Sequence, residues 1–199
     1  MIYPTGAGQI QQLPRDGIET YVSAQWFRDG MSVLFSGNEP GKGARFYVQK
    51  IGEGAARPVT PEGTRDGLLS PDGKLILARG ADEKYSIYPI AAADRVGEKP
   101  SREQEPESQP APGLTEADVL AQWSADGRSV LVYRRAEIPC RLERVDLATG
   151  RRTLFKAFAP ADPTGLLSVR EIFVTDDLRS YAYTAYYQLS TLFESEAKP

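Results

Sequence analysis

The stretch AQWFRDGMSVL at residues 24–34 returns as AQWSADGRSVL at residues 121–131, with 8 of 11 positions identical. A third copy, LSPDGKLIL, occupies residues 69–77, and a more divergent fourth, VTDDLRSYAY, occupies residues 174–183. The aspartates that mark the copies, at positions 29, 72, 126 and 177, are separated by 43, 54 and 51 residues. Such spacing is longer than that of a helical hairpin repeat and is close to the length of one small antiparallel sheet. The chain is therefore predicted to be a repeat array.

Each copy predicts a β-hairpin, because an apolar or aromatic run leads into the turn and a second apolar run follows at once. Asp-Gly readily takes the positive φ values that a tight turn between strands requires. The runs after the turns, SVLF at 32–35, LILA at 75–78 and SVLVY at 129–133, are nearly continuous in apolar side chains. Continuity indicates strands that are buried on both faces, as when small sheets stand face to face. We therefore predict an all-β chain with the β-propeller fold, with about four blades of four antiparallel strands.

The division into blades follows from the strands around each hairpin. Third strands are predicted at 44–49, 84–89 and 141–147, where polar and apolar residues alternate, and short fourth strands at 56–60 and 151–155. Residues 91–113 are rich in Pro, Glu, Arg and Ser, so we expect a flexible insertion in the second blade. The whole chain, 1–199, is predicted to be a single propeller or propeller fragment. Its blades are expected at 20–60, 66–112, 118–156 and 165–194, with 1–13 as the end of a preceding or shared blade.

The two ends of the chain leave the closure of the ring open. Residues 1–3 and 9–13 resemble third and fourth strands, whereas residues 171–174, 181–186 and 189–193 resemble first, second and third strands. Either the ends complete one shared blade and close a small ring, or the chain is an arc of a larger ring. Met1 begins directly in strand-like sequence, which favours a fragment. An open arc would expose apolar sheet faces and favour self-association, or association with the missing blades.

Catalytic and metal-binding motifs are lacking in the sequence. It contains no histidine, so the Ser-His-Asp and Cys-His arrangements and imidazole metal ligands are excluded. No Gly-x-Ser-x-Gly, glycine-rich phosphate loop, His-Arg-Asp or Asp-Phe-Gly motif is present. The single cysteine, Cys140, cannot form a zinc site or an intrachain disulfide, and is expected to be an inert core residue. We predict no catalytic residue, cofactor or metal, and a chain that is not an enzyme.

The remaining candidates are turn and surface residues. Trp26 and Trp123 occupy the same repeat position, so a shared packing role between blades is favoured over a ligand platform. Arg134 and Arg135, after the third hairpin, could line an exposed rim and bind an anion. The predicted structural turn residues are Asp29, Gly30, Asp72, Gly73, Asp126, Gly127 and Asp177.

The charge balance limits the class of partner. With 24 basic and 27 acidic residues interspersed, the net charge of −3 supplies no basic field for nucleic acid. No signal peptide or transmembrane segment is evident, so we expect a soluble chain without membrane insertion, and the sequence assigns no compartment. A protein, peptide or glycan is the expected partner, bound by loops on one end of the ring.

The repeat motif, including SPDG at residues 70–73, resembles the TolB-type, WD-like β-propeller families. Residues 35–41, 145–152 and 177–183 are similar to the carboxy-terminal propeller region of bacterial, eukaryotic-like serine/threonine kinases, whereas residues 194–199 depart from the expected last strand. This resemblance implies a scaffold for recognition in the sensor or interaction part of a signalling protein. Two alternatives stay open: an accessory propeller of a serine peptidase or other hydrolase, and a TolB-type periplasmic scaffold.

Overall fold

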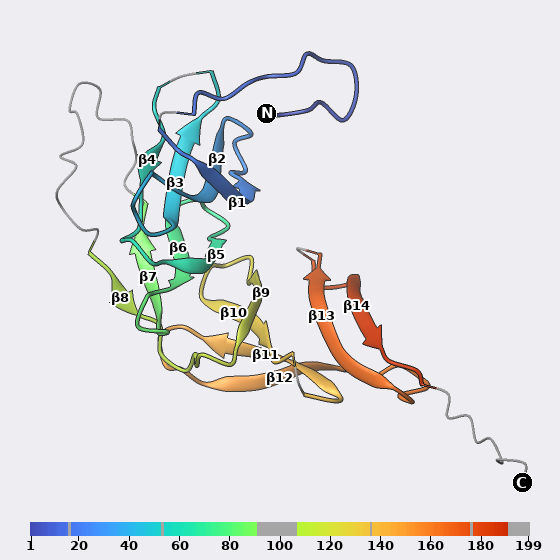
Figure 1. Cartoon of the computed structure of the whole chain (residues 1–199). Helices are drawn as coiled ribbons and strands as arrows, with labels where there is room; N and C mark the ends of the chain where they lie inside the picture. The colour runs from blue at the N-terminus through green and yellow to red at the C-terminus, as the bar shows by residue number, and fades with distance from the viewer. Residues whose placement is uncertain (16, 53, 91–106, 136, 176, 191–199) are drawn as a thin grey trace, which may run out of the picture.

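The computed structural model describes residues 1–15, 17–52, 54–90, 107–135, 137–175 and 177–190. Within these ranges the chain forms strands and no helix. The described residues therefore contain no helix long and apolar enough to cross a membrane. The strands lie in three antiparallel sheets of four strands and one of two, which follow one another in an arc (Figure 1). The prediction of an all-β chain with propeller architecture is confirmed.

Each sheet contains its strands in sequence order, from an inner first strand to an outer last one. The first sheet is β1 (Thr20–Trp26), β2 (Ser32–Asn38), β3 (Arg45–Lys50) and β4 (Arg57–Pro58). The second is β5 (Arg65–Leu69), β6 (Leu75–Arg79), β7 (Tyr85–Pro89) and β8 (Gln109–Pro110). The third is β9 (Val119–Trp123), β10 (Ser129–Tyr133), β11 (Cys140–Asp146) and β12 (Arg152–Phe158). The fourth is the hairpin β13 (Leu166–Val174) and β14 (Tyr181–Tyr187).

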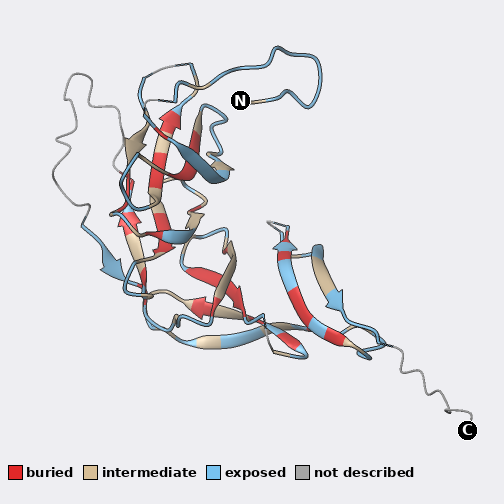
Figure 2. Ribbon diagram, viewed as in Figure 1, coloured by how far each residue is buried: buried red, intermediate tan, exposed pale blue. Residues whose placement is uncertain are grey.

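The hydrophobic core lies between consecutive sheets. Leu34 and Phe46 of the first sheet share a buried cluster with Ile76 of the second. On the opposite face of β6, Leu77 belongs to the next cluster, together with Trp123 of the third sheet. Figure 2 shows burial concentrated on middle strands such as β2, β6 and β10. The continuous apolar runs are thus explained, since alternate side chains of one strand enter two different cores.

The hairpin turns use the repeated aspartate and glycine in different ways. In the second sheet, Gly73 donates its N–H to the Ser70 carbonyl at 2.9 Å and has a φ of 72°. The Asp72 carboxylate accepts from the Ser70 hydroxyl at 2.7 Å and from the Lys74 N–H at 3.1 Å, and these bonds lower its pKa. Asp72 itself does not have a positive φ, so the expectation that Asp-Gly as a pair takes such values is corrected. The other three hairpins have the same backbone turn, with Leu178 in place of glycine in the last.

Two of these glycines separate backbone strain from packing. A Cβ added at Gly127 would meet nothing within 4 Å, whereas one at Gly73 would lie 2.8 Å from Cδ1 of Phe27. We expect Gly127→Ala to lower the free energy of unfolding by about 1 kcal/mol, the cost of a left-handed residue with a side chain. Gly73→Ala should lose about 1 to 3 kcal/mol more, because the ring of the neighbouring sheet must move. Urea unfolding of the two variants measures the difference, and equal losses would contradict the contact.

The insertion and the last blade differ from expectation. Of the predicted insertion 91–113, residues 91–106 lie outside the described residues. Gln109 and Pro110, which belong to it, form β8, because backbone pairing with β7 requires no apolar side chain. In the last blade only β13 and β14 form strands among the described residues; Leu189 and Ser190 do not extend them, and 191–199 lie outside. At the other end, Ile2 and Gln11 are joined by a single antiparallel bridge.

Candidate functional site

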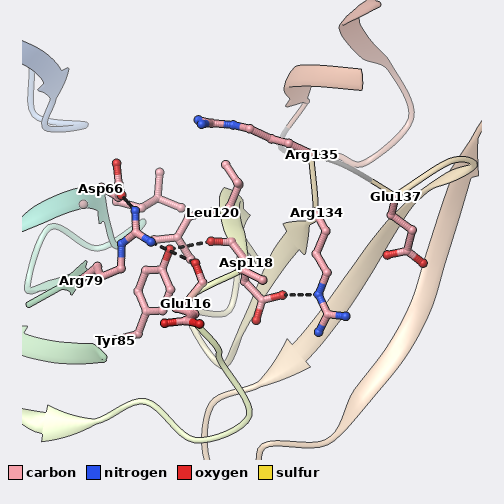
Figure 3. Close-up of a pocket in the computed structure, with 13 residues that line it drawn as sticks. Asp66, Arg79, Tyr85, Glu116, Asp118, Leu120, Arg134, Arg135 and Glu137 are labelled. Atoms are coloured by element: carbon pink, nitrogen blue, oxygen red, sulfur yellow. Dashed lines mark hydrogen bonds and ion pairs between the residues drawn. The ribbon is translucent and has the colours of Figure 1, made fainter. Parts of the chain in front are cut away.

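A first cavity, about 760 Å³ in volume, lies between the second and third sheets. This size falls within the range of small-molecule sites. Its walls come from the start of β5, the end of β6, the connection that leads into β9, and the segment after β10 (Figure 3). The polar lining residues are Asp66, Arg79, Tyr85, Glu116, Asp118, Arg134, Arg135 and Glu137.

Asp118 organises the wall between the two sheets. Its side chain is fully buried, and both carboxylate oxygens accept from the Arg152 guanidinium at 2.9 Å. The Thr115 N–H and hydroxyl donate to the same carboxylate at 2.8 and 2.9 Å. Burial acts to raise the pKa of Asp118, but these donors outweigh it and the pKa is lowered. The carboxylate is therefore held ionised, and it fixes the connection that carries Glu116.

Arg152 is bound on a second side, where Oε2 of Glu143 accepts from its Nε and Nη2 at 2.9 and 2.7 Å. A further bond runs from Nη1 to the Gly113 carbonyl at 3.0 Å. The hydrogen bonds to Asp118 and, to a smaller extent, to Glu143 raise the pKa of Arg152. Because all three guanidinium nitrogens are hydrogen-bonded, Arg152 joins the outer strand β12 to the connection between the second and third sheets.

On the side of the second sheet, Arg79 closes the cavity. It forms an ion pair with Asp66 and donates to the Glu116 carbonyl at 2.9 Å. The Tyr85 hydroxyl donates to the Asp118 carbonyl at 2.7 Å, and burial raises the pKa of this phenol to about 12. Arg79 and Tyr85 thus attach the second sheet to the backbone of the connection, although Nε of Arg79 is buried without a hydrogen-bond partner among the described residues.

Arg134 and Arg135 are the arginines of the cavity wall whose guanidinium groups are least engaged by other described residues. Nε of Arg134 lies 3.5 Å from Oδ1 of Asp118, a long contact for an ion pair, and its side chain is 45% exposed. Arg135 is exposed and forms no ion pair with any residue that the structure describes. Figure 3 shows its guanidinium clear of the other labelled side chains. The anion-binding candidates are therefore brought together in the cavity wall.

The two tryptophans, predicted to share one role, are in different environments. Trp123 is buried and its indole N–H donates to the Leu68 carbonyl of the second sheet at 3.0 Å. Trp26 is 52% exposed and borders a second cavity of about 740 Å³ beside the amino-terminal segment. The expectation of common packing is corrected for Trp26, because no described sheet stands on that side of β1 (Figure 1).

The predicted turn residues lie in the hairpin turns and do not line the first cavity, although Gly30 borders the second. Sequence reasoning missed Asp66, Arg79, Tyr85, Asp118 and Arg152. Asp118 and Arg152 are 34 positions apart and belong to no repeated motif. Their contact could therefore not be predicted from the repeats. Asp118 was identified only as the first residue of the predicted blade at 118–156.

Comparison with family models found no match, and comparison with curated proteins found none. Solved structures do match. An oligogalacturonate lyase in complex with manganese has a TM-score of 0.50 at 18% identity, covering 83% of this chain and 58% of that chain. TolB from Acinetobacter baumannii has a TM-score of 0.51 at 14% identity, with coverages of 83% and 43%. The Cps50 (Swd1) β-propeller domain from Myceliophteria thermophila has 0.52 at 13% identity, with coverages of 84% and 49%.

The chain thus spans about half the length of these structures. The manganese of the lyase has no counterpart in donor chemistry here, since no three carboxylate, thiol or imidazole side chains among the described residues lie together as metal ligands. The prediction that this chain is not an enzyme is wrong as an inference from its motifs, because a lyase has the same architecture. What the likeness shows is the fold: this chain is a β-propeller structure, as are TolB and the Cps50 domain.

Proposed function

We propose that this chain is a propeller recognition module that binds a carboxylate-bearing ligand in the cavity between the second and third sheets. The observation that carries the proposal is the pair of neighbouring arginines at the cavity wall, one weakly engaged by Asp118 and the other without an ion-pair partner among the described residues. Guanidinium groups bind carboxylates by two parallel hydrogen bonds, and an incompletely paired guanidinium keeps donors for such a ligand.

The pairing of the other charged side chains in the cavity also bears on which groups can bind a ligand. Four carboxylates line the cavity: Asp66 is engaged by Arg79, Asp118 by Arg152 and Glu137 by Arg141, whereas Glu116 forms no ion pair with any described residue. Arg134 and Arg135 stand on the segment that follows β10, and the Tyr133 hydroxyl at its base accepts from the Glu171 N–H at 2.9 Å. Rigid strands thus hold a short segment that presents the two cations, which is the arrangement expected of a binding loop.

The biological setting belongs to the same proposal. We place the module in the sensor or interaction part of a bacterial signalling protein, such as a serine/threonine kinase, on the strength of the sequence resemblance at residues 35–41, 145–152 and 177–183. A TolB-like scaffold is compatible with the same fold. Sequencing of the coding region on both sides distinguishes the settings, because a kinase domain supports the first and a secretion signal the second.

Isothermal titration with oligogalacturonate and with polyglutamate tests the carboxylate proposal, using a neutral oligosaccharide of equal length for comparison. We expect the anionic probes to bind and the neutral one not to bind. Arg134→Gln combined with Arg135→Gln should weaken binding by about 100-fold, because charged hydrogen bonds are lost. The matched control is Arg128→Gln, an exposed arginine in the third hairpin turn, which should leave affinity unchanged.

Two results would contradict the proposal: equal binding of neutral and anionic probes, and binding that survives the double substitution. Affinity should also fall as salt is added, because the arginine side chains are accessible to solvent. The oligogalacturonate mixtures are followed for cleavage as well, which reports whether the cavity carries chemistry in addition to recognition.

A further inference from the structure

Glu116 differs from the other carboxylates of the first cavity because it forms no ion pair with any described residue. Asp66, Asp118 and Glu137 each lie against an arginine. Glu116 lines the same cavity and is exposed to solvent. The cavity therefore offers a ligand an anionic group, in addition to the two arginines of the proposed carboxylate site.

The backbone that carries Glu116 is held in place from both sheets. The Asp118 N–H donates to the Thr115 carbonyl at 3.0 Å, which closes a turn that contains Glu116. The Asp118 carboxylate binds Thr115 in return at 2.8 and 2.9 Å, and Arg79 of the second sheet donates to the Glu116 carbonyl at 2.9 Å. A group whose backbone is fixed before binding loses less conformational entropy when a ligand arrives. The turn is therefore suited to present the Glu116 carboxylate to a ligand.

The Glu116 carboxylate is separated from the less engaged cations of the cavity. Figure 3 shows it and the Arg135 guanidinium at opposite edges of the site, with Leu120 labelled between them. Leu68 and Val119 also line the cavity. A ligand that contacts both charged groups must therefore carry two opposite charges that are separated by a partly apolar segment.

We propose that the cavity binds a short peptide, with its terminal carboxylate at Arg134 and Arg135 and its amino group at Glu116. This inference rests on the carboxylate site proposed above and names the class of ligand. A peptide carries an ammonium group at one end and a carboxylate at the other, and its side chains pack on Leu68 and Leu120 between them. The cavity volume of about 760 Å³ falls within the range of small-ligand sites.

Other carboxylate ligands match this arrangement of charges less well. A free α-amino acid carries its ammonium and carboxylate groups on one carbon atom, so it cannot contact both edges of the site. A polyanion such as oligogalacturonate brings further negative charges toward Glu116, which repels them. Repulsion of a competing ligand contributes to specificity together with attraction of the preferred one.

Isothermal titration with alanine peptides of two, three and four residues tests this inference. Each peptide is used with a free amino group and in N-acetylated form, at about pH 6, where the α-amino group is protonated. The three lengths sample charge separations of roughly 7 to 14 Å in extended peptides. We expect the free form of the best-fitting peptide to bind about 10-fold more tightly than its acetylated form, because acetylation removes the ammonium group.

Substitution of Glu116 should change the two forms of the peptide in opposite directions. Glu116→Gln should weaken binding of the free peptide by about 10-fold, and should slightly strengthen binding of the acetylated one. Glu137→Gln removes the same charge from the segment that carries the arginines, and should leave the preference for the free form intact. The matched control is Glu19→Gln, an exposed residue directly before β1, which should leave both affinities unchanged.

The outcomes separate this inference from the proposal on which it rests. Equal binding of free and acetylated peptides by the natural chain overturns the peptide assignment and leaves the carboxylate site standing. No binding of either form overturns both. A loss of both forms in Glu116→Gln would show that the side chain supports the turn rather than the amino group, and a preference that disappears in Glu137→Gln would move the contact to Glu137; either result overturns the role of Glu116.

Discussion

Arg152→Gln should lower the free energy of unfolding by about 3 to 5 kcal/mol at neutral pH, because it leaves a buried carboxylate without its principal partner. The side chain of Asp118 is fully buried, and Arg152 supplies two of its hydrogen bonds at 2.9 Å. Typical domains are stable by about 5 to 15 kcal/mol, so this single change would remove a large fraction of the stability. Urea unfolding monitored by tryptophan fluorescence measures it.

The pH dependence identifies the cause. In the natural chain the folded-state pKa of Asp118 is lowered, so its contribution is present above the unfolded pKa of the carboxyl group and is lost as pH falls through the folded pKa. Without Arg152, burial dominates and raises that pKa above its unfolded value, so the variant loses stability as pH rises. The difference between the two proteins should therefore shrink as pH is lowered from neutral toward the unfolded pKa of aspartate.

Two further variants serve as controls for the buried pair. Arg151→Gln changes the exposed neighbour of Arg152 and should unfold like the natural chain. Adding Asp118→Asn to Arg152→Gln removes the stranded charge, and should restore a substantial part of the loss. A loss in Arg152→Gln that does not vary with pH would show that packing of the side chain, rather than the ion pair, is what matters.

Trp123→Ala should lower the free energy of unfolding by about 3 to 5 kcal/mol, because a large buried ring is removed and the space cannot collapse fully. Trp123 is 4% exposed, and its indole N–H bonds to Leu68 across the sheets. Trp26→Ala, at the same repeat position, should cost less than about 1 kcal/mol in a single chain, since its side chain is half in solvent already.

Chemical denaturation with circular dichroism supplies the two free energies. Similar losses for the two tryptophans would contradict the difference in environment, and would indicate that the face of β1 is covered in solution.

Repeats and turns were predictable because each depends on neighbours in sequence. The four copies of the hairpin could be found from residues 24–34, 69–77, 121–131 and 174–183 alone. Continuous apolar strands indicated burial on both sides, and the three cores between sheets agree with this. Arg134 and Arg135 were also identified as anion-binding candidates from their position after a hairpin.

The identity of the cavity was not predictable in the same way. Asp118, Arg152, Arg79 and Tyr85 come from three different strands and one connection, and none of them recurs at equivalent places in the other copies. Their effect depends on a carboxylate being buried at the point where a guanidinium from an outer strand can reach it. Sequence spacing carries no information on that distance.

By itself, the amino-acid sequence determined the unit of this protein: a hairpin with a conformationally demanding turn and strands apolar on both sides, repeated along the chain. Local backbone preferences and side-chain periodicity are sufficient for that, because they act over a few residues. Only the tertiary structure decided which copy of a repeated side chain is buried. Trp26 and Trp123 have the same local sequence, and they differ because Trp123 packs against the second sheet, whereas no described sheet packs against Trp26.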